Sequence, residues 1–271
     1  MSISEKIAAK ADWVRRQTVT MAKTAPGIRV ASSLSPVEVL VALYYGDLVD
    51  FNPGKPLWAD RDRVILSKGH GSVAMYPILA DLGFIDSQEL DHVSGDQSRL
   101  TVIPEPTAPG IETTNGSLGH GLGVACGIAI ALKRRQKDQT VFVLCGDGEV
   151  NAGAIWEAVM LAAKHGLDNI VLVVDDNKRS MLGDQADILG LAPLAGKFSE
   201  FGWQASEMDG HDPDAVHANL LRLKRERGGV PKVVISHTVK GRGVPELEKD
   251  PISHVRILSP EAIDRILEEW R

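Results

Sequence analysis

The sequence predicts one α/β domain built on a doubly wound, mainly parallel sheet with helices on both faces. Two unbroken apolar runs, VFVLC from Val141 and IVLVVD from Ile170, are typical of strands buried on both sides. The apolar-periodic stretch 154–164 between them predicts a helix, which Gly166 ends. A strand–helix–strand crossover makes the two strands parallel neighbours. We therefore expect a functional site along the carboxyl ends of the strands.

Composition sets the class of protein. A chain of 271 residues with 44% hydrophobic content can bury a full core, so residues 1–271 are predicted to form a single domain. A net charge of −6 without a long basic run argues against a nucleic acid or an anionic membrane as the partner. The amino terminus is charged where a signal peptide would be apolar, which favours a cytoplasmic location. Cys126 and Cys145 lie in apolar runs and are expected to be buried thiols.

Helical and strand patterns alternate along the first half of the chain. Residues 3–23 are helical in pattern, and a second helix is predicted to begin at Ser35, with Pro36 in the first turn and Glu38 completing a capping box. The patterns that follow predict a strand at 64–66, a short helix at 87–93 and a long apolar helix at 122–132. In the long helix, small side chains are expected to allow close packing; they are Gly123, Ala125, Gly127 and Ala129.

The second half continues the alternation. Residues 185–200 predict a loop or short helices, and a strand and turn follow near Trp203. Asp212 and the proline after it start a helix that runs to about residue 227. Residues 231–237 predict another strand, and Ser259 caps a final helix.

Polar residues follow both strands of the central crossover. Asp147 lies between Gly146 and Gly148 in the first turn, and Asn177 lies thirty positions later, after the second strand. Parallel strands bring their carboxyl ends together, so the two side chains are expected to converge. A carboxylate and an amide oxygen are hard ligands suited to Mg²⁺ or Ca²⁺. The glycines would let the backbone approach a phosphate at the start of the following helix.

This spacing resembles the thiamine diphosphate motif of the transketolase family, GDG followed about thirty residues later by Asn. The resemblance implies the family's diphosphate-binding (PP-domain) fold. It also implies that Asp147, Asn177 and the backbone carbonyl of Arg179 hold Mg²⁺ on thiamine diphosphate. Gly146, Gly148 and Glu149 are then expected to contact the cofactor.

Other phrases of the family are also present. RDRVILSKGHGS resembles the family segment whose histidine contacts the cofactor diphosphate, which assigns that role to His70. The polar loop beyond HTVKGRG resembles a second segment and makes His254 a diphosphate-contacting, catalytic histidine. PGIETTNGSLGH resembles the wall beside the aminopyrimidine ring, which implies cofactor contacts for Gly116, Ser117 and Leu118.

The sequence also departs from the family at positions that bear on the substrate. Two histidines that help transketolases hold a ketose are replaced by Arg29 and Ile103. Arg29 could pair with a carboxylate or a phosphate of the substrate, and Ile103 would favour a methyl group. Ala152 stands where a glutamate usually reaches across the dimer, so that either Glu149 or Glu157 compensates or communication between the sites is altered.

The resemblance covers nearly the whole chain but only the first half of a full transketolase. It implies the N-terminal subunit of a two-chain, thiamine diphosphate- and Mg²⁺-dependent transketolase. A separate C-terminal chain with a pyrimidine-binding domain would be its partner, in an α2β2 heterotetramer. The expected reaction is transfer of a two-carbon ketol unit from a ketose phosphate to an aldehyde. Two alternatives are acetyl transfer from a pyruvate-like donor and a noncatalytic, partner-binding role.

Overall fold

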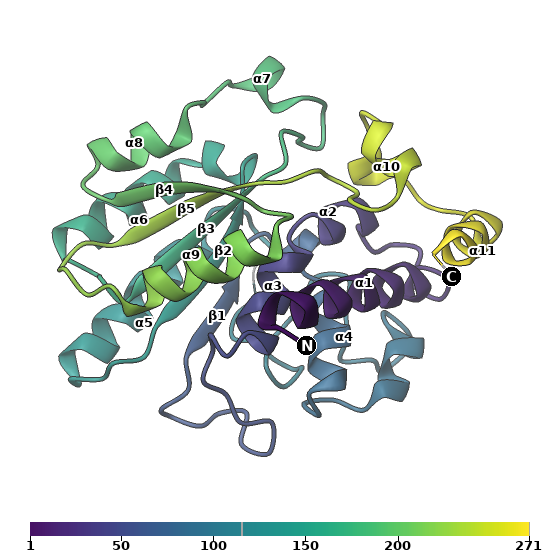
Figure 1. Ribbon diagram of the computed structural model, residues 1–271, viewed down its shortest axis with the longest axis horizontal. Coiled ribbons are helices and arrows are strands. Elements are labelled where there is room, and N and C mark those ends of the chain that lie inside the picture. The colour runs from purple at the N-terminus through teal and green to yellow at the C-terminus, as the bar shows by residue number, and fades with distance from the viewer. Residues whose placement is uncertain (115, 271) are drawn as a thin grey trace.

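A five-stranded parallel sheet forms the centre of the computed structural model, which describes residues 1–114 and 116–270 (Figure 1). The strands are β1 (Arg63–Leu66), β2 (Val141–Gly146), β3 (Ile170–Asp176), β4 (Gln204–Asp209) and β5 (Lys232–His237). Their order is β1-β2-β3-β5-β4, and each neighbouring pair is parallel. The predicted central crossover is confirmed: β2 and β3 pair from Val141 with Ile170 to Gly146 with Asp175.

Successive side chains of a strand point to opposite faces of the sheet, so each strand contributes to two separate hydrophobic cores. Phe142 and Leu144 belong to one core, whereas Val141 and Val143 belong to the other. The first core is covered by α1 (Ile3–Met21), α2 (Val30–Leu34), α3 (Val37–Tyr45), α4 (Met75–Asp81), α9 (Pro213–Arg225) and α11 (Pro260–Glu269). The second core is covered by α5 (Gly121–Arg134), α6 (Gly153–Lys164) and α8 (Leu194–Glu200). The sheet therefore has helices on both faces, as predicted.

Shorter elements connect these layers near the strand ends. They are α7 (Gln185–Ile188), α10 (Pro245–Lys249) and four 3₁₀ helices in the described residues: η1 (Gly69–Gly71), η2 (Ser87–His92), η3 (Glu149–Asn151) and η4 (Ser253–Val255). In the described part of the chain, no helix is both long enough and apolar enough to span a membrane.

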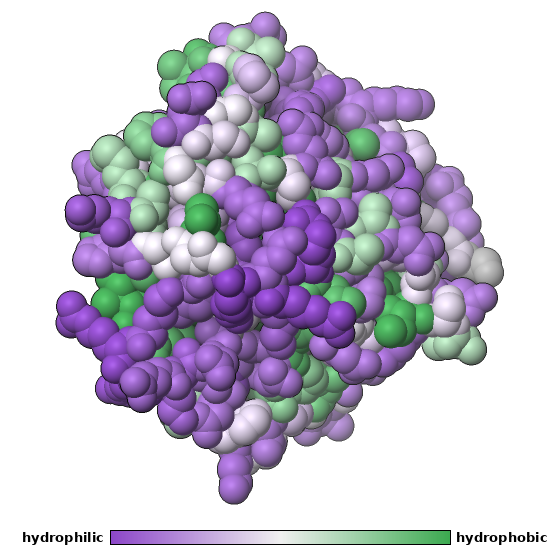
Figure 2. Space-filling view, turned by 60° about the vertical axis from the view of Figure 1, so that its left-hand side comes forward, coloured by the Kyte–Doolittle hydropathy of each residue, from purple (hydrophilic) through white to green (hydrophobic). Residues whose placement is uncertain are grey.

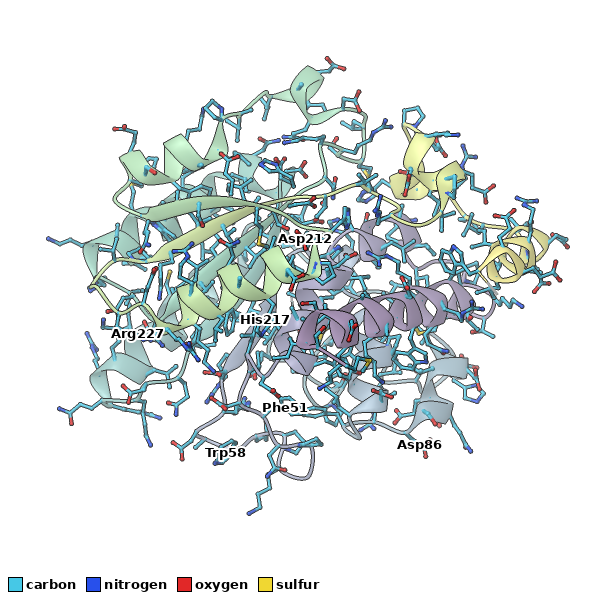
Figure 3. The ribbon with its side chains drawn as sticks, in the orientation of Figure 1. Phe51, Trp58, Asp86, Asp212, His217 and Arg227 are labelled. Atoms are coloured by element: carbon cyan, nitrogen blue, oxygen red, sulfur yellow. The ribbon has the colours of Figure 1, made fainter. Side chains whose placement is uncertain are left out.

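Helix α9 illustrates how local signals place an element. The side chain of Asp212 accepts hydrogen bonds from the backbone N–H groups of Asp214 and Ala215, and Arg227 lies beyond the opposite end (Figure 3). His217 on the same helix contacts the carbonyl of Gly46 with its Nε2 at 2.9 Å, which ties α9 to the end of α3. Hydrophilic residues cover most of the face drawn in Figure 2, with apolar residues in separate patches.

Two local predictions were wrong, and both fail for tertiary reasons. No side chain caps α3, because Ser35 donates to Asp175 and Glu38 pairs with Arg15 instead of closing a capping box. Of the four small residues expected to pack closely in α5, Ala125 and Ala129 are buried, whereas Gly123 and Gly127 are exposed and no neighbouring element lies within 4 Å of a Cβ added to either. The expectation that both thiols are buried is confirmed, since Cys126 and Cys145 are free and inaccessible.

Candidate active site

A cavity of about 400 Å³ opens at the carboxyl edge of the sheet. The segments that follow β1, β2, β3 and β5 all contribute to its wall. Its charged and polar lining includes Lys68, His70, Asp147, Asn177, Lys240 and His254. The strand ends thus bring together residues that are more than 180 positions apart in the sequence, as expected for a parallel sheet.

Asp147 and Asn177 converge at this edge, as their spacing predicts. Oδ2 of Asp147 accepts a hydrogen bond from the backbone N–H of Lys178 at 2.7 Å, and its Oδ1 accepts one from Gly148 at 2.8 Å. Oδ1 of Asn177 accepts from the backbone N–H of Arg179 at 3.1 Å. Asp147 therefore joins the turns after β2 and β3, and Asn177 lies in the second of these turns.

A buried carboxylate, Asp175, fixes the direction of the Asn177 amide. It accepts hydrogen bonds from Ser35 at 2.6 Å, from Nδ2 of Asn177 at 3.1 Å and from the ammonium of Lys68. Burial raises the pKa of Asp175, but the charge of the Lys68 ammonium and the hydrogen bonds from Lys68, Ser35 and Thr238 outweigh burial and hold the pKa below its usual value. Because Nδ2 is held by Asp175, Oδ1 of Asn177 is the amide atom left to act as an acceptor or ligand.

The charge around Asp147 suits a cation. Burial and the neighbouring Asp175 raise the pKa of Asp147 to about 7, with a further contribution from Asp176. Among the described residues, no group of three or more His, Cys, Asp and Glu side chains is arranged to hold a metal. The oxygens available here are a carboxylate, an amide and backbone carbonyls. This set of few, hard donors fits Mg²⁺, which usually completes its shell with phosphate and water.

Two histidines lie beside each other in the wall of the cavity. The rings of His70, in η1, and His254, in η4, lie 4.8 Å apart between centroids. Burial and then Lys68 lower the pKa of His70 to about 3, and burial and then Lys240 lower that of His254 to about 4. Both rings are therefore neutral near pH 7, and each can accept a proton through one nitrogen and donate through the other.

Lys240 connects His254 to the loop after β3. Its Nζ lies 3.0 Å from the carbonyl oxygen of Arg179, 3.4 Å from that of Ser180 and 3.0 Å from Nδ1 of His254. Burial, followed by Lys68, lowers the pKa of Lys240 to about 8. An ammonium can only donate, so Nδ1 of His254 accepts and the ring proton is on Nε2.

Glu149 holds three loops together at the floor of the site. Its carboxylate accepts from the Ser67 hydroxyl at 2.5 Å and from the backbone N–H groups of Gly119 at 2.8 Å and Gly146 at 3.1 Å. Glu149 is buried, whereas Glu157 is exposed on α6. Glu149 therefore positions the loops after β1 and β2 against the start of α5.

The remaining residues predicted from the sequence divide into two groups. Gly146, Gly148, Glu149, Arg179 and Leu118 line the cavity with the residues named above. Gly116, Ser117, Arg29 and Ile103 are not among the lining residues, although Arg29 contributes to the lowered pKa of His254. The guanidinium of Arg179 pairs with Asp184, its Nε lying 3.2 Å from that carboxylate.

Sequence reasoning missed two lysines of the site. Lys68 directly precedes the glycine before His70, and Lys240 lies in the phrase HTVKGRG, so both were within motifs that point to the family. Each follows a strand of the parallel sheet, and that position was the available signal.

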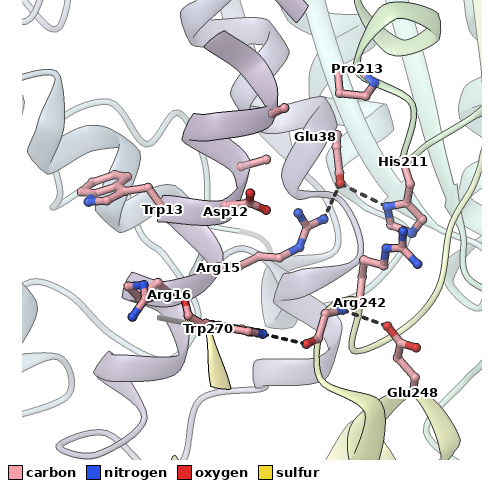
Figure 4. A pocket seen from close by; sticks show the side chains of 13 residues that line it. Asp12, Trp13, Arg15, Arg16, Glu38, His211, Pro213, Arg242, Glu248 and Trp270 are labelled. Atoms are coloured by element: carbon pink, nitrogen blue, oxygen red, sulfur yellow. Dashed lines mark hydrogen bonds and ion pairs between the residues drawn. The ribbon is translucent and has the colours of Figure 1, made fainter. Parts of the chain in front are cut away.

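A larger cavity of about 730 Å³ lies beside α1 and α3, where the loops after β4 and β5 meet them (Figure 4). The Arg15 guanidinium donates to both oxygens of Glu38 at 2.6 Å, and Nδ1 of His211 lies 3.2 Å from Oε2 of Glu38. Nε2 of His211 accepts from the backbone N–H of Val239 at 2.8 Å. These bonds give His211 a structural role, because they join the loops after β4 and β5 to α3.

Comparison with known proteins agrees with this geometry. The family description "Transketolase, thiamine diphosphate binding domain" matches residues 10–270. The chain belongs to the transketolase family. It is 36% identical over 269 residues to an apulose-4-phosphate transketolase subunit of Actinobacillus succinogenes, covering 98% of this chain and 96% of that protein. It is 37% identical over 233 residues to a 6-deoxy-6-sulfo-D-fructose transketolase subunit of a Clostridium species, covering 86% and 84% of the two chains.

Solved transketolases share the fold. The transketolase of Campylobacter jejuni superposes with a TM-score of 0.86 at 29% sequence identity. The match covers 100% of this transketolase-family chain and 43% of the Campylobacter chain. The described sheet and its helices therefore correspond to less than half of that solved enzyme.

Proposed function

We propose that this chain is the N-terminal, cofactor-binding subunit of a two-chain transketolase that depends on thiamine diphosphate and Mg²⁺. The convergence of Asp147, Asn177 and two neutral histidines on one cavity carries the proposal. Relatives named as transketolase subunits, which match this chain over most of their own length, support the two-chain organisation. The reaction is transfer of a two-carbon ketol unit from a ketose phosphate to an aldehyde.

Each group at the strand edge has a role in this proposal. Asp147, Asn177 and the carbonyl of Arg179 would hold Mg²⁺, since they supply hard oxygens from adjacent turns. Gly146, Gly148 and Glu149 line the cavity and would contact the diphosphate, and Leu118 in the same wall would contact the aminopyrimidine ring. When bound, thiamine diphosphate supplies the electron sink for breaking a carbon–carbon bond beside a ketone.

His70 and His254 are assigned as the catalytic residues of this subunit. Both are neutral near pH 7, and their rings are neighbours in the cavity wall. The Nε2–H of His254 can donate to an oxygen that gains negative charge, because Lys240 holds the opposite ring nitrogen. The His70 ring is neutral and can accept a proton without first losing a positive charge.

An exposed apolar rim supports a partner chain at this site. Large apolar side chains on the cavity wall reach solvent, with Met181 53%, Leu182 77% and Leu189 62% exposed. An apolar rim of this kind marks a surface that a partner can cover. We therefore assign residues 1–271 to one cofactor-binding domain and a C-terminal, pyrimidine-domain chain to the rim, in an α2β2 cytoplasmic enzyme.

Acetyl transfer from a pyruvate-like donor was the second candidate. It requires Arg29 and Ile103 to meet the donor, and neither residue lines the cavity of this chain. This lining favours ketol transfer, and the experiment below separates the two reactions.

The test is cofactor binding followed by turnover. Titration with thiamine diphosphate and Mg²⁺ should show saturable binding that requires the metal and is lost in Asp147→Asn. The chain reconstituted with its partner should transfer a ketol unit from xylulose 5-phosphate to an aldehyde. Decarboxylation of pyruvate without ketol transfer would select the acetyl reaction, and binding without either turnover would select the noncatalytic role.

A further inference from the structure

The carbonyl oxygen of Arg179 already has a cationic partner in this structure. The ammonium of Lys240 donates to it at 3.0 Å and to the carbonyl of Ser180 at 3.4 Å. Lys240 is 4% exposed, so water does not replace these bonds. The same Arg179 oxygen is the backbone ligand assigned to Mg²⁺ in the proposed function.

These two roles of one oxygen compete. A divalent ion on the Arg179 carbonyl would bring two positive charges close together in a site with little water, where Coulomb repulsion is strong. Asp147 and Asp175 attract the ammonium as they would attract a metal ion, whereas burial and Lys68 oppose its charge and lower the pKa of Lys240 to about 8. Lys240 is thus a cation beside the two carboxylates that a metal ion would also face.

We infer that Lys240 is an internal cation that occupies the metal-binding carbonyl of the cofactor-free protein and leaves it when the divalent ion binds. The inference rests on the proposed function, because it takes the Arg179 carbonyl as a metal ligand. In the cofactor-free state, the ammonium binds the carbonyls of Arg179 and Ser180 and so keeps the loop after β3 in the conformation that the metal would need. Nδ1 of His254, 3.0 Å from Nζ, is a second partner of the same ammonium.

The backbone beside Lys240 is tied to α2, because the N–H of Gly241 donates to the carbonyl of Ala31 at 2.9 Å. A side chain at Gly241 would also meet Leu247, since an added Cβ would lie 2.6 Å from the Cβ of Leu247. We therefore take the exchange to be a motion of the Lys240 side chain.

The test measures metal binding alone, with Mn²⁺ followed by electron paramagnetic resonance and no thiamine diphosphate present. Lys240→Met and Lys240→Gln remove the charge and should bind Mn²⁺ at least about tenfold more tightly than the parent chain, because the repulsion is gone. Lys240→Arg keeps the charge and should stay within about threefold of the parent. Adding Asp147→Asn to Lys240→Gln should abolish the tight Mn²⁺ binding, and this loss would locate the bound Mn²⁺ at Asp147.

Lys232 provides a matched control. It is also buried, and its ammonium donates at 2.7 Å to the backbone carbonyls of Leu223 and Glu226, far from the loop after β3 that contains the proposed metal ligands. Lys232→Met should therefore leave the Mn²⁺ affinity unchanged, and circular dichroism should confirm that each variant is folded. Unchanged or weaker Mn²⁺ binding in both charge-removing variants would overturn the inference. If the parent chain instead fails to bind thiamine diphosphate with Mn²⁺, the proposed function itself fails.

Discussion

The hydroxyl of Ser35 donates to Oδ2 of Asp175 at 2.6 Å, across 140 residues of sequence. The same Asp175 oxygen accepts from Nδ2 of Asn177 at 3.1 Å, so a residue before α3 helps to orient a proposed metal ligand after β3. Ser35→Ala should lower the free energy of unfolding by about 1–2 kcal/mol, because a buried charged acceptor loses a donor. Urea unfolding measures this loss.

Ser33 is the control for Ser35. Its hydroxyl donates only to the carbonyl of Arg29, which also accepts from the backbone N–H of Ser33. Ser33→Ala should therefore change the unfolding free energy by less than about 0.5 kcal/mol. Equal losses of unfolding free energy in the two variants would mean that the hydrogen bond from Ser35 to Asp175 contributes no more stability than the one from Ser33 to Arg29.

Glu149→Gln should weaken the floor of the site. The variant can no longer accept at both oxygens from Ser67, Gly119 and Gly146, so we expect a loss of about 2–3 kcal/mol in unfolding free energy. Thiamine diphosphate affinity, measured by calorimetry, should fall with it. Glu157→Gln, on the exposed face of α6, should change neither quantity.

Metal affinity should depend on pH through Asp147. Its pKa is raised to about 7, so the carboxyl is increasingly protonated below that pH, and a proton must leave before the oxygen can bind Mg²⁺. The apparent affinity should fall by up to about tenfold per pH unit below pH 7. His70 and His254 titrate near 3 and 4 and do not interfere between about pH 5.5 and 7. A flat Mg²⁺ affinity over that range would contradict the assignment.

Acid stability should depend on Glu38. Burial raises its pKa, but the bonds from His211 and Arg15 outweigh burial and hold the pKa below the value usual for a glutamate. A carboxyl with a lowered folded pKa stabilises the protein above its unfolded pKa and loses that contribution as the pH falls through the folded value. The parent chain should exceed Glu38→Gln by about 2–3 kcal/mol in unfolding free energy near pH 7. The difference in unfolding free energy between the parent chain and Glu38→Gln should narrow below about pH 4.5. Denaturant unfolding from neutral to acid pH measures this difference, and a constant difference would contradict the prediction.

The apolar rim should govern association with the partner chain. Leu182→Asp and Leu189→Asp each place a charge on a side chain that is largely exposed, so the thermal midpoint of the isolated chain should not change. Complex formation in sedimentation velocity should weaken at least about tenfold, because a buried unpaired carboxylate costs more than about 1.4 kcal/mol. Leu57→Asp, at a residue that is 86% exposed but lines a different cavity, should assemble normally.

Sequence periodicity and motif spacing were sufficient for the scaffold and for the central pair of the site. The runs at Val141 and Ile170 have the pattern of strands buried on both faces, and their parallel pairing placed Asp147 beside the turn that contains Asn177. These are local or nearest-neighbour properties, because strand period, helix period and crossover length are encoded in contiguous residues.

Only the tertiary structure decided where the buried polar groups find their partners. Ser35 and Glu38 have the spacing of a capping box, but Asp175 and Arg15 offer charged partners inside the core, and those bonds replace the local ones. Lys240 was an unremarkable residue in the phrase HTVKGRG until the fold placed its ammonium on the Arg179 carbonyl. A buried charge pairs with whichever opposite charge the packing brings near, and the packing joins segments that the sequence keeps far apart.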